Sequence, residues 1–112
     1  MTRIGSYAFR GCSRLTSINI PEGVTSIGED AFDGCKSLTN IKIPDGVTSI
    51  GDWAFKGCSS LNSIKIPEGV TSIGYKAFKG CSNLEIVIDN SKDNVQVRSS
   101  TFEGCKSVKY LK

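Results

Sequence analysis

The chain has 112 residues, of which 38% are hydrophobic and 22% charged, a composition typical of a folded domain rather than a disordered segment. No apolar run approaches the ~20 residues that a membrane-spanning helix needs. The net charge of +3 and the isoelectric point of 8.6 lie below the strongly basic range of nucleic-acid-binding domains. Histidine is absent, which removes the commonest general base and argues against an enzyme.

A 23-residue unit recurs along the chain, marked by five cysteines and five phenylalanines. These are Cys12, Cys35, Cys58, Cys81 and Cys105, with Phe9, Phe32, Phe55, Phe78 and Phe102. Successive cysteines are separated by 23, 23, 23 and 24 residues. One domain, 1–112, therefore divides into a partial unit 1–19, full units 20–42, 43–65 and 66–88, and a degenerate unit 89–112.

The short unit decides the class of fold. A unit of this length has too few apolar positions to enclose a core, so copies of it must cover one another from above and below. The sequence therefore predicts a mainly β solenoid of about five turns, each supplying short parallel strands.

Within a unit, the elements follow in a fixed order. The strands are predicted from the pattern L-x-x-I-x-I at 15–20, 38–43 and 61–66, which ends in the alternation of a half-buried strand. A Pro-Glu-Gly or Pro-Asp-Gly turn then reverses the chain, and "VTSI" returns as a second extended piece. The segment "AFKGC" and its equivalents lie between glycines and are long enough only for a helical turn.

The full unit, I-P-[ED]-G-V-T-S-I-G-x-x-A-F-x-G-C-x-x-L-x-x-I-x, resembles the BspA-like (Treponema pallidum type) leucine-rich repeat over essentially the whole chain. The resemblance implies a right-handed solenoid with parallel strands. It also implies a cell-surface or secreted protein that serves in adhesion and protein binding. The degenerate last unit departs from the family pattern because it lacks the proline turn.

The candidate binding residues come from the solvent side of the L-x-x-I-x-I strands. The alternation predicts that Ser17, Asn19, Asn40, Lys42, Ser63, Lys65, Ile86, Ile88, Tyr110 and Lys112 face outward. Ile86 and Ile88 would then form an apolar spot beside Tyr110, unless residues 89–99 cover it, and Lys42, Lys65 and Lys112 would form a basic stripe. We therefore expect a protein partner to contact Asn40, Lys42, Ser63, Lys65, Ile86, Ile88 and Tyr110.

Two further columns offer other chemistry. The cysteines are odd in number and occupy equivalent inward positions, which favours buried free thiols over disulfides or a metal site. Glu22, Asp45 and Glu68 stack at one edge of the solenoid, where they either bridge a divalent cation or are solvated turn residues, the second being favoured. No cofactor, nucleic acid or membrane insertion is expected.

The leading functional hypothesis is a non-enzymatic binding and adhesion module, with an extracellular-matrix or host-surface protein as partner. Two alternatives remain: an engineered or consensus-like scaffold, suggested by the near identity of three units, and a structural protein that self-associates through uncapped end turns. Surface location or secretion follows from the family resemblance alone, because the chain contains no recognisable signal peptide.

Overall fold

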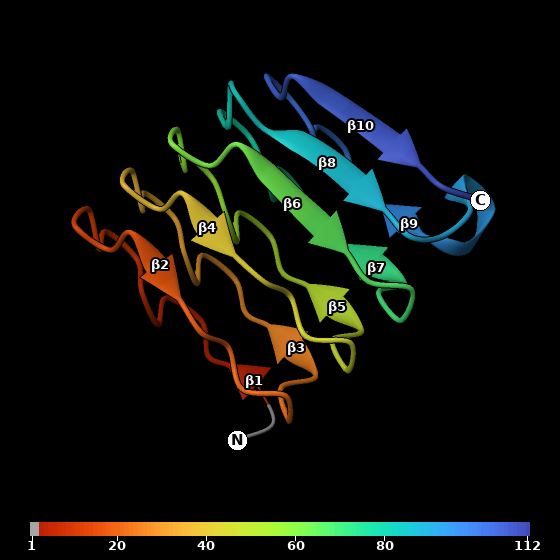
Figure 1. Ribbon diagram of the computed structural model, residues 1–112, viewed down its shortest axis with the longest axis horizontal. Coiled ribbons are helices and arrows are strands. Elements are labelled where there is room, and N and C mark those ends of the chain that lie inside the picture. Colours follow the sequence, from red (N-terminus) through yellow and green to blue (C-terminus); the bar gives the residue numbers. More distant parts are fainter. Residues whose placement is uncertain (1–2) are drawn as a thin grey trace.

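The computed structural model describes residues 3–112, which form a single coil whose turns stack side by side from lower left to upper right in Figure 1. The principal extents are 35 × 31 × 21 Å. The predicted solenoid of about five 23-residue turns with parallel strands is confirmed. Partner residues in adjacent middle turns, such as Ser26 and Ser49 or Ile50 and Ile73, are one repeat apart.

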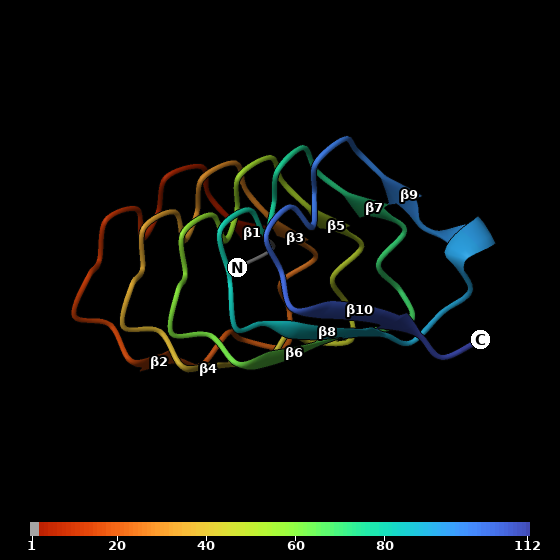
Figure 2. The same ribbon diagram turned by 90° about the horizontal axis from the view of Figure 1, so that it is seen from above.

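The "VTSI" segments and their equivalents form the more continuous of the two strand layers (Figure 2). They build a five-stranded parallel sheet in the order β1-β3-β5-β7-β9. Its strands are β1 (Arg3–Ile4), β3 (Ser26–Ile27), β5 (Ser49–Ile50), β7 (Ser72–Ile73) and β9 (Gln96–Val97).

The L-x-x-I-x-I segments form the second layer, which is divided. One sheet pairs β2 with β4, and a separate sheet has the order β10-β8-β6. The strands are β2 (Ser17–Ile18), β4 (Asn40–Ile41), β6 (Ser63–Ile66), β8 (Glu85–Ile88) and β10 (Ser107–Tyr110). A 3₁₀ helix, η1 (Lys92–Asn94), lies in the connection that follows β8 and replaces the proline turn of the earlier units.

The predicted helical turns are instead series of tight turns with i→i−3 hydrogen bonds. In the third repeat the N–H groups of Ala54, Lys56 and Cys58 donate to the carbonyls of Gly51, Trp53 and Phe55. This path requires left-handed φ angles, +56° at Trp53 and +74° at Gly57, and these angles interrupt any helix.

The core consists of columns of identical side chains. Phe32, Phe55 and Phe78 are fully buried, and their rings stack with centroids 5.2 Å apart. The last ring, Phe102, stands 6.2 Å from Phe78. In that turn Arg98 and Thr101 occupy the positions where the other turns have glycine and alanine.

The cysteines are free thiols, as predicted, and lie beside the phenylalanine column. Four of these thiols, those after the first turn, each donate a hydrogen bond to a phenylalanine carbonyl of the preceding turn, as Cys58 Sγ does to Phe32 O over 3.2 Å. Burial raises the pKa of Cys35, and it raises the pKa of Cys105 to about 12. These thiols are therefore held in the neutral form.

The thiol pKa values predict alkaline unfolding. A thiol whose pKa is higher in the folded chain stabilises the fold fully below its unfolded pKa of 9.0, and this stabilisation is lost as the pH rises toward about 12. We expect the urea midpoint to fall between pH 8 and pH 11, and to fall less in a Cys105→Ala variant. Equal midpoints at the two pH values for the unmodified chain would contradict this expectation.

Candidate functional site

The outward-facing side of β2, β4, β6, β8 and β10, called here the ladder face, carries part of the predicted set of binding residues. Asn40, Lys42, Ser63 and Lys65 are exposed there, as the strand alternation predicts. Whether they bind a partner stays a prediction.

The prediction that Ile86 and Ile88 face solvent is wrong. Ile86 pairs with Ile64 and Ile88 with Ile66, and both are buried, with 1% and 0% of their surface exposed. The segment Leu84–Ile86 has one residue fewer between its apolar positions than Leu61–Ile64, so counting from the cysteines shifts β8 by one residue. A one-residue shift exchanges the two faces of a strand.

Tyr110 follows the same shift. It pairs with Ile88, packs against the core and is only half-buried because no strand covers it on its other side within residues 3–112. Partial burial raises the pKa of its phenol. Ile86 and Ile88 therefore do not belong to the ladder face, and the side chain of Tyr110 is only partly exposed.

The basic stripe also differs from the prediction. The register places Lys65, Val87 and Lys109 in one row across β6, β8 and β10. Lys112 lies elsewhere, with its Nζ 3.5 Å from Glu68 Oε2 and 3.4 Å from Asp89 Oδ1. The hydrogen bond to Asp89 and the charges of both carboxylates raise the pKa of Lys112.

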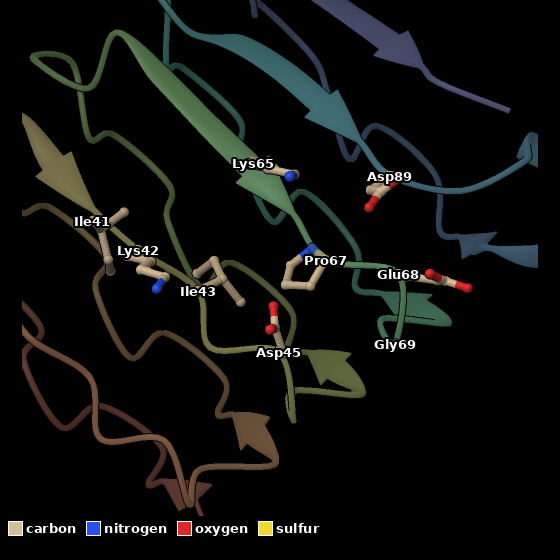
Figure 3. Close-up of a pocket in the computed structure, with 9 residues that line it drawn as sticks. All are labelled: Ile41, Lys42, Ile43, Asp45, Lys65, Pro67, Glu68, Gly69 and Asp89. Carbon is tan, nitrogen blue, oxygen red and sulfur yellow. The ribbon is translucent and has the colours of Figure 1, made fainter.

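The ladder face is interrupted between the second and third turns. Within residues 3–112, backbone hydrogen bonds join β2 to β4 and join β8 to both β6 and β10, whereas none joins β4 to β6. A cleft of about 570 Å³ opens at this interruption (Figure 3). Its lining consists of Ile41, Lys42, Ile43, Asp45, Lys65, Pro67, Glu68, Gly69 and Asp89.

The cleft combines an apolar floor with a charged rim. Ile43 and Pro67 are buried, while Lys42, Lys65, Asp45 and the further carboxylates surround them. Figure 3 shows Lys42 on the chain after β4 and Lys65 on β6, so the two segments that border the interruption carry one lysine each. The rim therefore presents two lysines and three carboxylates around the apolar floor.

Two residues of the acidic column, Asp45 and Glu68, contribute to this rim. Glu22, Asp45 and Glu68 are exposed. Within the described residues 3–112, no group of three or more metal-ligating side chains is close enough to hold a cation. No helix in the same range is long and apolar enough to cross a bilayer.

Sequence reasoning missed Val87, Lys109 and Asp89 as members of this region. The signal was available for Val87: aligning the Ile-x-Ile patterns directly, rather than by the cysteine period, places Val87 beside Lys65. The cleft could not be predicted in this way. It exists because β4 and β6 are not hydrogen-bonded to each other, although the segments that contain them have nearly the same sequence pattern.

Comparison with known proteins places this geometry in a family. The protein-family model described as "BspA type Leucine rich repeat region" matches residues 1–112 in six copies. The chain belongs to this family. Leucine-rich-repeat proteins generally bind other proteins. No curated protein matches the sequence significantly.

Two solved structures of leucine-rich-repeat proteins are similar to the chain. The Treponema pallidum leucine-rich-repeat protein is 34% identical, with a TM-score of 0.86, over 96% of this chain and 51% of its own. A leucine-rich-repeat protein from Bacteroides ovatus is 30% identical, with a TM-score of 0.69, over 94% of this chain and 34% of its own. The chain thus spans about half of the length of the first of these relatives and about a third of the second.

Proposed function

We propose that the chain is a non-enzymatic protein-binding module that contacts its partner through the ladder face, around the cleft between β4 and β6. The observation that carries this proposal is the cleft itself. It joins an apolar floor to two exposed lysines at the interruption of the ladder between β4 and β6. Family membership supports a binding role.

The setting of this module is part of the same proposal. BspA-type repeats are commonly surface-associated. The module acts in adhesion, as a segment of a cell-surface or secreted protein that binds an extracellular-matrix or host-surface protein. Acidic groups of the partner would face Lys42, Lys65 and Lys109, and an apolar side chain would enter the cleft.

The test removes the two cleft lysines and compares binding. A Lys42→Ala/Lys65→Ala variant should bind a purified extracellular-matrix protein at least about tenfold more weakly, with a smaller dependence on salt, because charge pairs at an interface steer and fix the partner. Biolayer interferometry against a panel of matrix proteins measures this affinity.

A matched control separates the ladder face from net charge. Lys36 and Lys56 are exposed and lie outside the cleft lining, so Lys36→Ala/Lys56→Ala removes the same charge elsewhere. This control should keep its affinity within about twofold, and both variants should keep their melting temperature. Equal losses in the two variants would mean that charge alone, and not the ladder face, governs binding.

A further inference from the structure

At the interruption between β4 and β6, a proline removes one of the backbone hydrogen bonds that join later turns. In the next turn, the N–H group of Asp89 donates to the carbonyl of Ile66 over 2.9 Å. The equivalent residue one turn earlier is Pro67, which has no N–H to donate. Within residues 3–112, no hydrogen bond reaches the equivalent acceptor, the carbonyl of Ile43. The cleft therefore contains a backbone acceptor beside its apolar floor.

Two successive turns carry the same order of charge across the cleft. The sequence reads Lys-Ile-Pro-Asp at 42–45 and Lys-Ile-Pro-Glu at 65–68. Along the direction of β6 in Figure 3, the two lysines come first, the apolar floor follows, and the carboxylates of Asp45 and Glu68 come last. A row of positive charge and a row of negative charge thus border the floor on opposite sides.

This arrangement is confined to the two turns that flank the cleft. In the turns before and after them, Asn19 and Val87 occupy the lysine position. The last turn has Lys109 in this row, but it has Lys112 where the flanking turns have a carboxylate. Both charges therefore occur together in the described turns only beside the cleft.

The charged groups that face the cleft are available to a partner. Lys42, Lys65 and Asp45 are exposed, and within residues 3–112 no ion pair joins them to another side chain. At the acidic end, the Nζ of Lys112 lies 3.5 Å from Glu68 Oε2. The chain's own ammonium group thus illustrates the chemistry that this end accepts.

The dimensions of the cleft match those of an extended peptide. Its volume of about 570 Å³ is large enough for several side chains. Residues of an extended chain rise by about 3.3 Å each, so the three steps from Lys42 to Asp45 cover about 10 Å. A peptide that lies along the strands presents alternate side chains to the cleft about 6.6 Å apart. Three alternate residues therefore reach from one charged row to the other.

We propose that the partner segment bound by the cleft is an extended peptide with an acidic, an apolar and a basic residue at alternate positions. Its carboxylate faces Lys42 and Lys65, and its apolar side chain packs on the floor. Its ammonium or guanidinium group faces Asp45 and donates to the carbonyl of Ile43. A second acidic residue would meet the carboxylates, and a second basic residue would meet the lysines. This preference rests on the proposed function and adds to it a requirement for a basic residue.

The test compares three peptides that differ only in charge. Their central residues are Glu-Thr-Leu-Thr-Lys, Glu-Thr-Leu-Thr-Glu and Lys-Thr-Leu-Thr-Lys, and each is titrated into the ¹⁵N-labelled chain while its amide resonances are followed by NMR. The mixed peptide should bind at least about fivefold more tightly than the other two, because only it pairs with both charged rows. It should shift the amide resonances of Lys42, Ile43 and Asp45. Equal affinities of the three peptides would overturn the inference.

Reversing one charge of the cleft should reverse the preference. Asp45 is exposed, so Asp45→Lys should keep the melting temperature, and this variant should bind the acidic peptide more tightly than the mixed one. The matched control is Glu103→Lys, which makes the same change of charge at an exposed residue outside the cleft lining. The control should still prefer the mixed peptide. An Asp45→Lys variant that keeps this preference would also contradict the inference.

The peptide preference and the proposed function fail separately. If Lys42→Ala/Lys65→Ala weakens binding to a matrix protein while the three peptides bind equally, the ladder face binds its partner without a basic residue, and only the peptide preference is wrong. If the peptides bind as expected while no matrix protein responds to the lysine substitutions, the cleft recognises the peptide and the choice of a matrix protein as partner is wrong.

Discussion

Replacing Gly51 by alanine is expected to destabilise the fold by about 3 kcal/mol or more, the upper part of the range for overpacking. The new Cβ would lie 2.7 Å from both Glu29 N and Gly28 C in the turn before. Both atoms are backbone, so they can retreat only if adjacent turns move apart. That movement would stretch the 2.8 Å hydrogen bond from Gly51 N–H to Ile27 O and loosen the buried columns beside it.

The control for this prediction is the same substitution at the first position of the column. Within residues 3–112, the new methyl group of Gly5→Ala meets no atom closer than 4 Å, so the free energy of unfolding should change by no more than about 0.5 kcal/mol. Urea unfolding monitored by circular dichroism measures both variants. If the two substitutions cost the same, close packing between turns is not what selects glycine here.

The repeat period was sufficient to predict the fold and most of the core. A buried column needs the same residue at the same offset in each turn, and the cysteines and phenylalanines show that offset directly in the sequence. The period also predicted that Asn40, Lys42, Ser63 and Lys65 would be exposed, because the units that contain them are regular. Regular units thus carry their structural information in the spacing alone.

The same period misled where the units are irregular. β8 lost one residue before Ile86, and the connection after β8 gained others, so the cysteine spacing of 24 conceals two compensating changes. The register of β8 is set by its own apolar residues rather than by the distance from the cysteine. Burying Ile86 and Ile88 beside Ile64 and Ile66 removes apolar surface from water, whereas a register shifted by one residue would expose both side chains.

Two features of the structure could not be predicted from the sequence, because both depend on how the turns pack on one another. The left-handed φ angles of Tyr7, Asp30, Trp53, Lys76 and Ser100, between 52° and 63°, occur at a position where residue type varies. Tertiary stacking imposes that conformation against local preference. The interruption between β4 and β6 likewise depends on how whole turns are placed, and it creates the cleft at the centre of the candidate site.

Replacing Phe55 by alanine is expected to cost about 3–5 kcal/mol of stability, the usual range for a fully buried phenylalanine. Phe55 lies in the middle turn, with the rings of Phe32 and Phe78 each 5.2 Å from its own. Its removal would leave a cavity with an aromatic ring on either side. Since a domain of this size is stabilised by only about 5–15 kcal/mol, the loss is a large part of the total.

Exposed substitutions provide the comparison for Phe55→Ala. Tyr7→Ala removes an aromatic ring that is 50% exposed, and reversing the charges of Glu22, Asp45 and Glu68 alters only exposed carboxylates. Each should change the free energy of unfolding by about 1 kcal/mol or less. Thermal and urea melts that reverse this order would contradict the inward assignment of the phenylalanine column. Because each turn is stabilised only by its neighbours, a loss at Phe55 should also uncouple the two halves of the stack and broaden the unfolding transition.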